Sequence, residues 1–145
     1  MAFVGRAAAA AIGIGFLLAA WLPAQPAESF KARLSAVAAD ARTRAELAGI
    51  GSATATLSGT KLTVTGSFEG LRSPASMAQL HAASAAGIRG PVIGDLTVSP
   101  AVSGSLSGSF DLTPPQIESL RKGGLYIQIH SQKAPDGVLW GWLLR

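Results

Sequence analysis

The sequence predicts an all-β domain, an antiparallel sandwich or open barrel with one short helix. Apolar and polar residues alternate in several short runs, as they do in strands that bury one face. Glycine and proline separate these runs at short intervals, in the positions where turns are expected. Only the segment after Leu112 combines helical spacing with capping residues. No internal repeat and no second domain is visible in the 145 residues.

The N-terminal segment has the features of a secretory signal peptide. Arg6 supplies a positive charge, residues 7–22 are uninterruptedly apolar, and residues 23–27 include small residues suited to cleavage. The apolar run is shorter than the ~20 residues that usually span a bilayer; an uncleaved anchor is the alternative. We expect residues 1–27 to be the signal and residues 28–145 to form one exported domain, periplasmic or extracellular, with no membrane span in the mature chain.

The predicted strands follow the alternating runs. In chain order they are residues 29–37, 52–57, 61–68, 77–82, 91–98, 105–112, 123–130 and 137–143. Residues 58–60 (Ser-Gly-Thr) predict one hairpin turn, and residues 135–137 (Pro-Asp-Gly) predict another. Residues 39–48 break the alternation and predict a loop or a short helix.

One short helix is predicted between the sixth and seventh strands. Thr113 is a suitable N-cap, Pro114 fits the first turn, and Gln116 completes a capping box. The helical spacing of Ile117 and Leu120 and the stop at Gly123 predict about two helical turns.

Composition excludes several classes of function. Removing residues 1–27 leaves 11 of the 12 basic side chains against 8 acidic ones, and they are scattered. No basic run interleaves with aromatic residues, so a nucleic-acid partner is not expected. The chain has no cysteine, which excludes thiolate catalysis, iron–sulfur clusters and cysteine-bound zinc. No Gly-x-Ser-x-Gly turn precedes a helix, and we expect no catalytic residues.

Several motifs occur in a fixed order along the chain. They are residues 68–74 (Phe-Glu-Gly-Leu-Arg-Ser-Pro), 78–81 (Ala-Gln-Leu-His), 90–92 (Gly-Pro-Val), 112–116 (Leu-Thr-Pro-Pro-Gln), 120–123 (Leu-Arg-Lys-Gly), 126–130 (Tyr-Ile-Gln-Ile-His), and Gly137 with Gly141 and Leu143. Together they resemble the CHRD domain, a family named for chordin and widespread in exported bacterial proteins. The resemblance runs from about Ser29 to Leu143.

This resemblance implies an immunoglobulin-like β-sandwich with a distant kinship to copper/zinc superoxide dismutases. It implies no particular activity, because the family has no settled biochemical function. The chain departs from the family pattern in two places. Gln79 replaces the first histidine of the His-x-His strand, and Val138, Trp140 and Trp142 replace polar residues of the last strand.

Four polar side chains are predicted to share one face of two strands. Residues two apart in a strand point the same way, so Gln79 and His81 face away from the core, as do Gln128 and His130. If the two strands are neighbours, these residues converge into one patch, a candidate ligand site.

The patch has two interpretations. His81 and His130 could bind copper or zinc, the metals that imidazole favours, but a catalytic metal usually needs about three protein ligands. Gln79 is an amide, and nothing in the spacing of Asp95 or Asp136 marks either as the third ligand. The alternative is that both histidines make hydrogen bonds that stabilise loops.

The last strand carries two large aromatic residues on its outer face. Val138, Trp140 and Trp142 alternate with core residues such as Leu139, and a tryptophan buries ~150–250 Å² when covered. Either residues 39–48 cover this face or a partner does. Stacking on a sugar or another flat ligand is a further alternative.

We therefore expect an exported, non-catalytic binding or interaction module of the CHRD type, with a protein partner or self-association and no cofactor. A structural envelope protein that packs against partners has the same sequence features. The alternative from another class is a metal-binding or redox protein, using His81 and His130 with copper or zinc at a site like that of superoxide dismutase.

Overall fold

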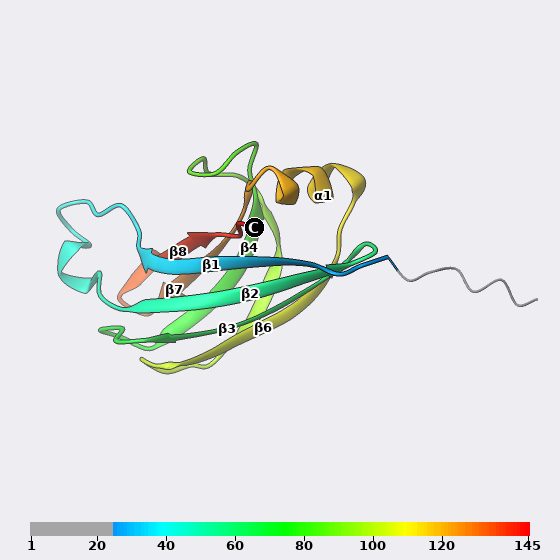
Figure 1. Cartoon of the computed structure of the whole chain (residues 1–145). Coiled ribbons are helices and arrows are strands. Elements are labelled where there is room, and N and C mark those ends of the chain that lie inside the picture. The colour runs from blue at the N-terminus through cyan, green and yellow to red at the C-terminus, as the bar shows by residue number, and fades with distance from the viewer. Residues whose placement is uncertain (1–24) are drawn as a thin grey trace, which may run out of the picture.

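The computed structural model describes residues 25–145 and contains eight strands, one α-helix and one 3₁₀ turn (Figure 1). Most of the predicted signal peptide, residues 1–24, lies outside the described residues. The elements in chain order are β1 (Glu28–Ala36), η1 (Arg44–Glu46), β2 (Ile50–Ser58), β3 (Lys61–Glu69), β4 (Ala75–Ala82), β5 (Val92–Val98), β6 (Gly104–Asp111), α1 (Pro114–Arg121), β7 (Leu125–Ser131) and β8 (Ala134–Trp142). None of the described helices is long and apolar enough to cross a membrane.

The strands form a closed antiparallel barrel in the order β1-β2-β3-β6-β5-β4-β7-β8, with β8 returning to β1. The expected all-β class and single helix are confirmed, but the expected two-sheet sandwich is wrong. Two short seams join what would otherwise be separate sheets. One seam pairs Ser35 with Trp140 on β1 and β8, and the other pairs Thr97 with Ser107 on β5 and β6. These seams remove the free edges of both sheets.

The barrel interior is the hydrophobic core. In β1, β2 and β3 every second residue is buried and its neighbours are mostly exposed, which is the pattern of a strand with one wet face. The largest fully buried apolar side chains come from most strands and from the helix: Phe30, Leu34, Leu62, Leu80, Leu106, Leu120, Leu125, Ile127, Ile129, Leu139 and Leu143. β7 differs, because all seven of its residues are buried. Something therefore covers the outer face of β7 as well.

The predicted helix forms as expected. Thr113 accepts a hydrogen bond from the backbone of Gln116, whose side chain bonds back to Thr113. Leu120 is its buried residue, and the positive φ of Gly123 (78°) ends it. The break at residues 39–48 is a loop that contains the short 3₁₀ turn η1.

The last hairpin turns three residues earlier than predicted. Its tight turn is Gln132–Lys133, with Ser131 paired to Ala134, so the predicted Pro-Asp-Gly turn is wrong. Residues 135–138 instead form a wide irregularity inside β8. Between the pairs Ile129–Leu139 and Ser131–Ala134, β8 has four residues where β7 has only His130. Proline cannot donate to the ladder and glycine permits unusual backbone angles, so this segment bulges.

Candidate functional site

The outer face of β4, β7 and β8 holds the predicted polar patch and an aromatic cluster. His81 pairs with Tyr126, which in turn pairs with Trp142 on β8. The ring centroids of His81 and Tyr126 lie 4.6 Å apart and the planes differ by 12°, so the rings stack. The centroids of Tyr126 and Trp142 lie 5.2 Å apart. Tyr126 is only 1% exposed, although its side chain points out of the barrel.

The loop of residues 83–91 covers this row. The backbone N–H of Gly90 donates to the hydroxyl of Tyr126 (3.1 Å), which lies 3.3 Å from the Gly90 carbonyl. The same carbonyl lies 3.0 Å from Nδ1 of His81. The guanidinium of Arg89 lies 4.7 Å from the ring centroid of Trp140, in cation–π contact. This loop covers the Tyr126 end of the outer face of β7.

A second row lies beside the first, where Gln128 pairs with Gln79 on one side and with Trp140 on the other. The amide of Gln79 donates to the carboxylate of Asp95 (3.0 Å). The amide of Gln128 donates to the backbone carbonyl of Asp136 in the β8 bulge (2.8 Å). The predicted neighbourhood of β4 and β7 is therefore present, and the two glutamines face each other.

The two histidines lie at opposite ends of the patch. His130 is opposite Met77, four residues along β7 from the level of His81, which is about 13 Å at ~3.3 Å per residue. Nδ1 of His130 lies 2.7 Å from the carbonyl of Pro135 in the bulge. The loop of residues 83–91 thus binds His81, and the β8 bulge binds His130.

The two imidazoles have the same hydrogen-bonding pattern. A carbonyl oxygen can only accept, so Nδ1 carries a proton in both rings; in the neutral form of an imidazole protonated at Nδ1, Nε2 is an acceptor. In both His81 and His130 the Nε2 atom is buried without a partner among the described residues. Burial lowers the pKa of His81, which favours its neutral form. Within residues 25–145 no group of three or more histidine or acidic side chains is arranged to hold a metal ion.

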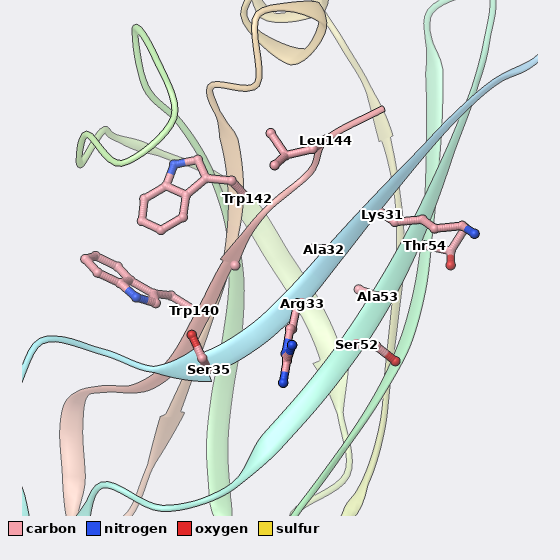
Figure 2. Close-up of a pocket in the computed structure, with 11 residues that line it drawn as sticks. Lys31, Ala32, Arg33, Ser35, Ser52, Ala53, Thr54, Trp140, Trp142 and Leu144 are labelled. Carbon is pink, nitrogen blue, oxygen red and sulfur yellow. The ribbon is translucent and has the colours of Figure 1, made fainter.

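A groove of about 700 Å³ runs along the seam between β1 and β8 (Figure 2). We call it the seam groove. Its lining residues are Lys31, Ala32, Arg33, Ser35, Ser52, Ala53, Thr54, Trp140, Gly141, Trp142 and Leu144. Figure 2 shows the two indole rings one above the other beside β8, with Ser35 next to Trp140.

The seam groove lies where β1 and β8 are incompletely paired. Ser35–Trp140 is a registered pair, and Lys31–Leu144 is an isolated bridge. The stretch between them contains no registered pair. Here a Cβ on Gly141 would lie 2.3 Å from the Arg33 carbonyl oxygen, so only glycine allows this approach.

The tryptophans are half-buried, and Val138 is not part of their surface. Val138 is fully buried (0% exposed) in the core cluster, because the β8 bulge turns it inward. The surface predicted from residues 138, 140 and 142 is therefore reduced to Trp140 and Trp142. Their ring centroids lie 4.7 Å apart. Residues 39–48 do not line the seam groove, and the cover over Trp140 comes from Arg89.

Sequence reasoning missed the β1 and β2 side of the groove. Lys31, Arg33 and Ser35 are exposed and alternate with core residues of β1. This alternation is the signal in the sequence that places their side chains on the outer face of the barrel. Nothing in the local pattern indicates that the first strand lies beside the last one.

The positive charge of the groove is not neutralised within the described residues. The three ion pairs there are Arg121–Glu28, Arg145–Glu28 and Lys122–Glu118, so neither Lys31 nor Arg33 takes part in one. No carboxylate lines the groove. A second hollow of about 460 Å³, which shares Arg33 and Ser52, does include Glu69.

Comparisons with known proteins agree with the resemblance seen in the sequence. The family model of the CHRD domain matches residues 30–143, from the third residue of β1 to just beyond β8. No curated protein and no solved structure matches the chain. The matched span includes the whole outer patch, both tryptophans and the β1 side of the seam groove. The chain therefore belongs to the CHRD domain family.

Proposed function

We propose that this protein is an exported, non-catalytic binding module of the CHRD type, and that Trp140 and Trp142 are the centre of its contact surface. One observation carries the proposal. Two neighbouring tryptophans lie half-exposed in an open groove of about 700 Å³, a volume typical of ligand sites. Aromatic residues in such positions dominate binding energy in many interfaces.

The hydrogen bonding of the outer patch supports a non-catalytic role. His81, Gln128 and His130 each bond to a backbone carbonyl of the covering loop or of the bulge. Each is also less than 9% exposed, so little of these side chains is available to a substrate. Their contacts account for the burial of β7 and fix the segments that border the tryptophans.

The experiment that tests this proposal replaces Trp140 and Trp142 with the polar residues typical of the family. We expect Trp140→Arg/Trp142→Gln to retain the barrel, measured by circular dichroism, and to lose self-association or retention by the cell-envelope fraction. Sedimentation velocity measures the former and co-sedimentation the latter. A variant that does not fold, together with a strictly monomeric wild type that nothing retains, would show that the tryptophans only pack within the domain.

Export is tested separately. The apolar run and the small residues at positions 23–27 support cleavage near Glu28. We expect N-terminal sequencing of the protein from its native host to start within a few residues of Glu28. A retained Met1 or Ala2 in the membrane fraction would favour an anchor instead.

A second candidate function is metal binding through His81 and His130. It is favoured by the free, buried Nε2 atoms and by the Nδ1 bonds to carbonyls, because metal-bound histidines commonly donate their other N–H in this way. The four-residue offset along β7 argues against one shared ion. Copper or zinc that remains with the purified protein and is lost on either His→Ala change would promote this function.

A further inference from the structure

The seam groove combines aromatic rings, unpaired cations and hydroxyl groups, and we propose that it binds an acidic saccharide, a segment of a uronic-acid oligosaccharide. This inference rests on the proposed function, since it names the ligand of the surface centred on Trp140 and Trp142. Each of the three chemical features corresponds to one part of such a ligand.

The cations of the groove would bind the carboxylate of the ligand. Lys31 and Arg33 are exposed, line the groove and have no acidic partner within residues 25–145. Nearby basic residues are used differently, since Arg121 and Arg145 both bind Glu28. Guanidinium groups bind carboxylates with two parallel hydrogen bonds. The groove therefore offers a free Arg33 where a carboxylate can reach it.

The indole rings would pack against the apolar face of a sugar ring. Pyranose rings present C–H groups on their faces, and tryptophan offers a large flat apolar area. Trp142 meets Trp140 at an interplanar angle of 62°, and Arg89 holds the Trp140 ring in place. The cluster is thus ordered before any ligand arrives, which reduces the entropic cost of binding.

The hydroxyl groups of the groove would form hydrogen bonds with the hydroxyl groups of the sugar. Ser35, Ser52 and Thr54 line the groove with exposed side chains, and no side-chain hydrogen bond involves them among the described residues. The groove extends from the Ser35–Trp140 pair to the Lys31–Leu144 bridge, about 13 Å at ~3.3 Å per residue. That length exceeds one sugar ring, so an oligosaccharide fits better than a monosaccharide.

A single-stranded nucleic acid is the other anionic ligand that stacks on aromatic rings. The observations favour the saccharide. Only two cations line the groove, whereas a nucleic-acid channel needs a continuous basic track along the backbone. The edge-to-face arrangement of the two indoles also leaves no parallel slot for a base.

The experiment titrates the purified exported protein with trigalacturonate, uncharged galactotriose, galacturonate monomer and a short oligothymidylate. Trp140 and Trp142 are the only tryptophans beyond residue 27, so their fluorescence reports directly on the groove; calorimetry gives the affinity. We expect saturable binding of trigalacturonate, weaker binding of the monomer, and no binding of galactotriose or the nucleotide.

Three variants assign the binding to the groove. Arg33→Gln should weaken trigalacturonate binding on the order of tenfold, the usual loss for a charge-assisted pair. Trp140→Ala should abolish it. Arg72→Gln removes one exposed positive charge outside the groove and should bind as the wild type does. Arg33→Gln leaves the aromatic cluster unaltered, so its result does not depend on whether Trp140→Ala folds.

The outcomes separate this inference from the proposed function. Equal binding of the charged and neutral trisaccharides, or unchanged binding in Arg33→Gln, would overturn the acidic ligand and leave a tryptophan-centred binding surface. Binding of oligothymidylate alone would overturn the saccharide. No binding of any probe would also overturn the saccharide; the proposed function then stands or falls with self-association and envelope retention in Trp140→Arg/Trp142→Gln.

Discussion

The change Tyr126→Phe tests how the loop of residues 83–91 is held over the barrel. It removes one oxygen atom and leaves the ring in its place against His81 and Trp142. The lost hydroxyl accepts the N–H of Gly90 and lies within hydrogen-bonding distance of its carbonyl. After the change the carbonyl keeps its contact with Nδ1 of His81, whereas the N–H has no acceptor.

The size of the expected stability loss follows from the Gly90 N–H, which loses its acceptor in Tyr126→Phe. A buried donor left without an acceptor costs about 1–3 kcal/mol. Gly90 is half-buried, so water reaches it in part and the expected loss in the free energy of unfolding is ~1–2 kcal/mol. For a domain of this size that lowers Tm by roughly 4–8 °C. The loop should also open locally, which would free Arg89 from Trp140.

Two measurements check this prediction: urea unfolding, and amide hydrogen exchange at Gly90. Thr113→Ala is a matched control, because it removes the N-cap bond of α1 at a cost of ~1 kcal/mol and does not touch the loop. Exchange at Gly90 should accelerate in Tyr126→Phe well beyond the control. Equal exchange in the two variants, or an unchanged Tm in Tyr126→Phe, would refute the view that Tyr126 holds the loop.

Three further predictions concern the patch and the bulge. His130→Ala should lower the free energy of unfolding by about 1–3 kcal/mol, because it leaves a carbonyl of the bulge unpaired, and should leave the metal content of the purified protein unchanged; loss of a bound metal would contradict the structural role. Because burial lowers the pKa of His81, the unfolded chain takes up its proton first as the pH falls. Stability should therefore be complete above the unfolded pKa of ~6.5 and decline as the pH falls toward the lowered folded value. Urea unfolding at a series of pH values should show a flatter dependence of stability on pH in His81→Phe than in the wild type. The same dependence in both proteins would contradict the role of His81. Gly137→Ala should destabilise the protein on the order of 3 kcal/mol, since φ is 124° and a Cβ would lie 2.1 Å from the Gln128 amide. Gly59→Ala, with φ of 62° and no atom within 4 Å, should cost only ~1–2 kcal/mol in the same thermal unfolding assay; equal losses would show that the contact with Gln128 is unimportant.

The functional proposals depend on how the molecule supports its tryptophans. Arg89 contacts Trp140 from the loop, and the Tyr126 ring packs against both indoles. The same tyrosine binds the loop through its hydroxyl. Loosening the loop in Tyr126→Phe should therefore also change the fluorescence of Trp140 and Trp142, which links the stability prediction to the proposed binding surface.

The sequence by itself predicted the helix, the family and the approximate positions of the strands, apart from the turn that opens the last one. Period-two alternation is a local property, so it identified the core faces of β1, β2 and β3 from neighbouring residues alone. The capping box at Thr113 also acts within a few residues and was correctly predicted. The outward direction of Gln128 and His130 was predicted on the same basis, and both occupy the face opposite to the core residues of β7.

The tertiary structure alone decided which strands close the barrel and what covers the outer face. Pairing between β1 and β8 joins residues about a hundred positions apart, and alternation contains no information on such neighbours. Together with the β5–β6 pairing, the β1–β8 pairing turned the expected sandwich into a barrel, and it placed Arg33 and Trp142 in the lining of one groove. Register likewise depends on distant contacts: Pro135 forms part of a bulge because the hairpin closes earlier, at Gln132–Lys133. Burial of the outer face follows from that bulge and from the covering loop, because a residue's exposure depends on every segment that packs against it.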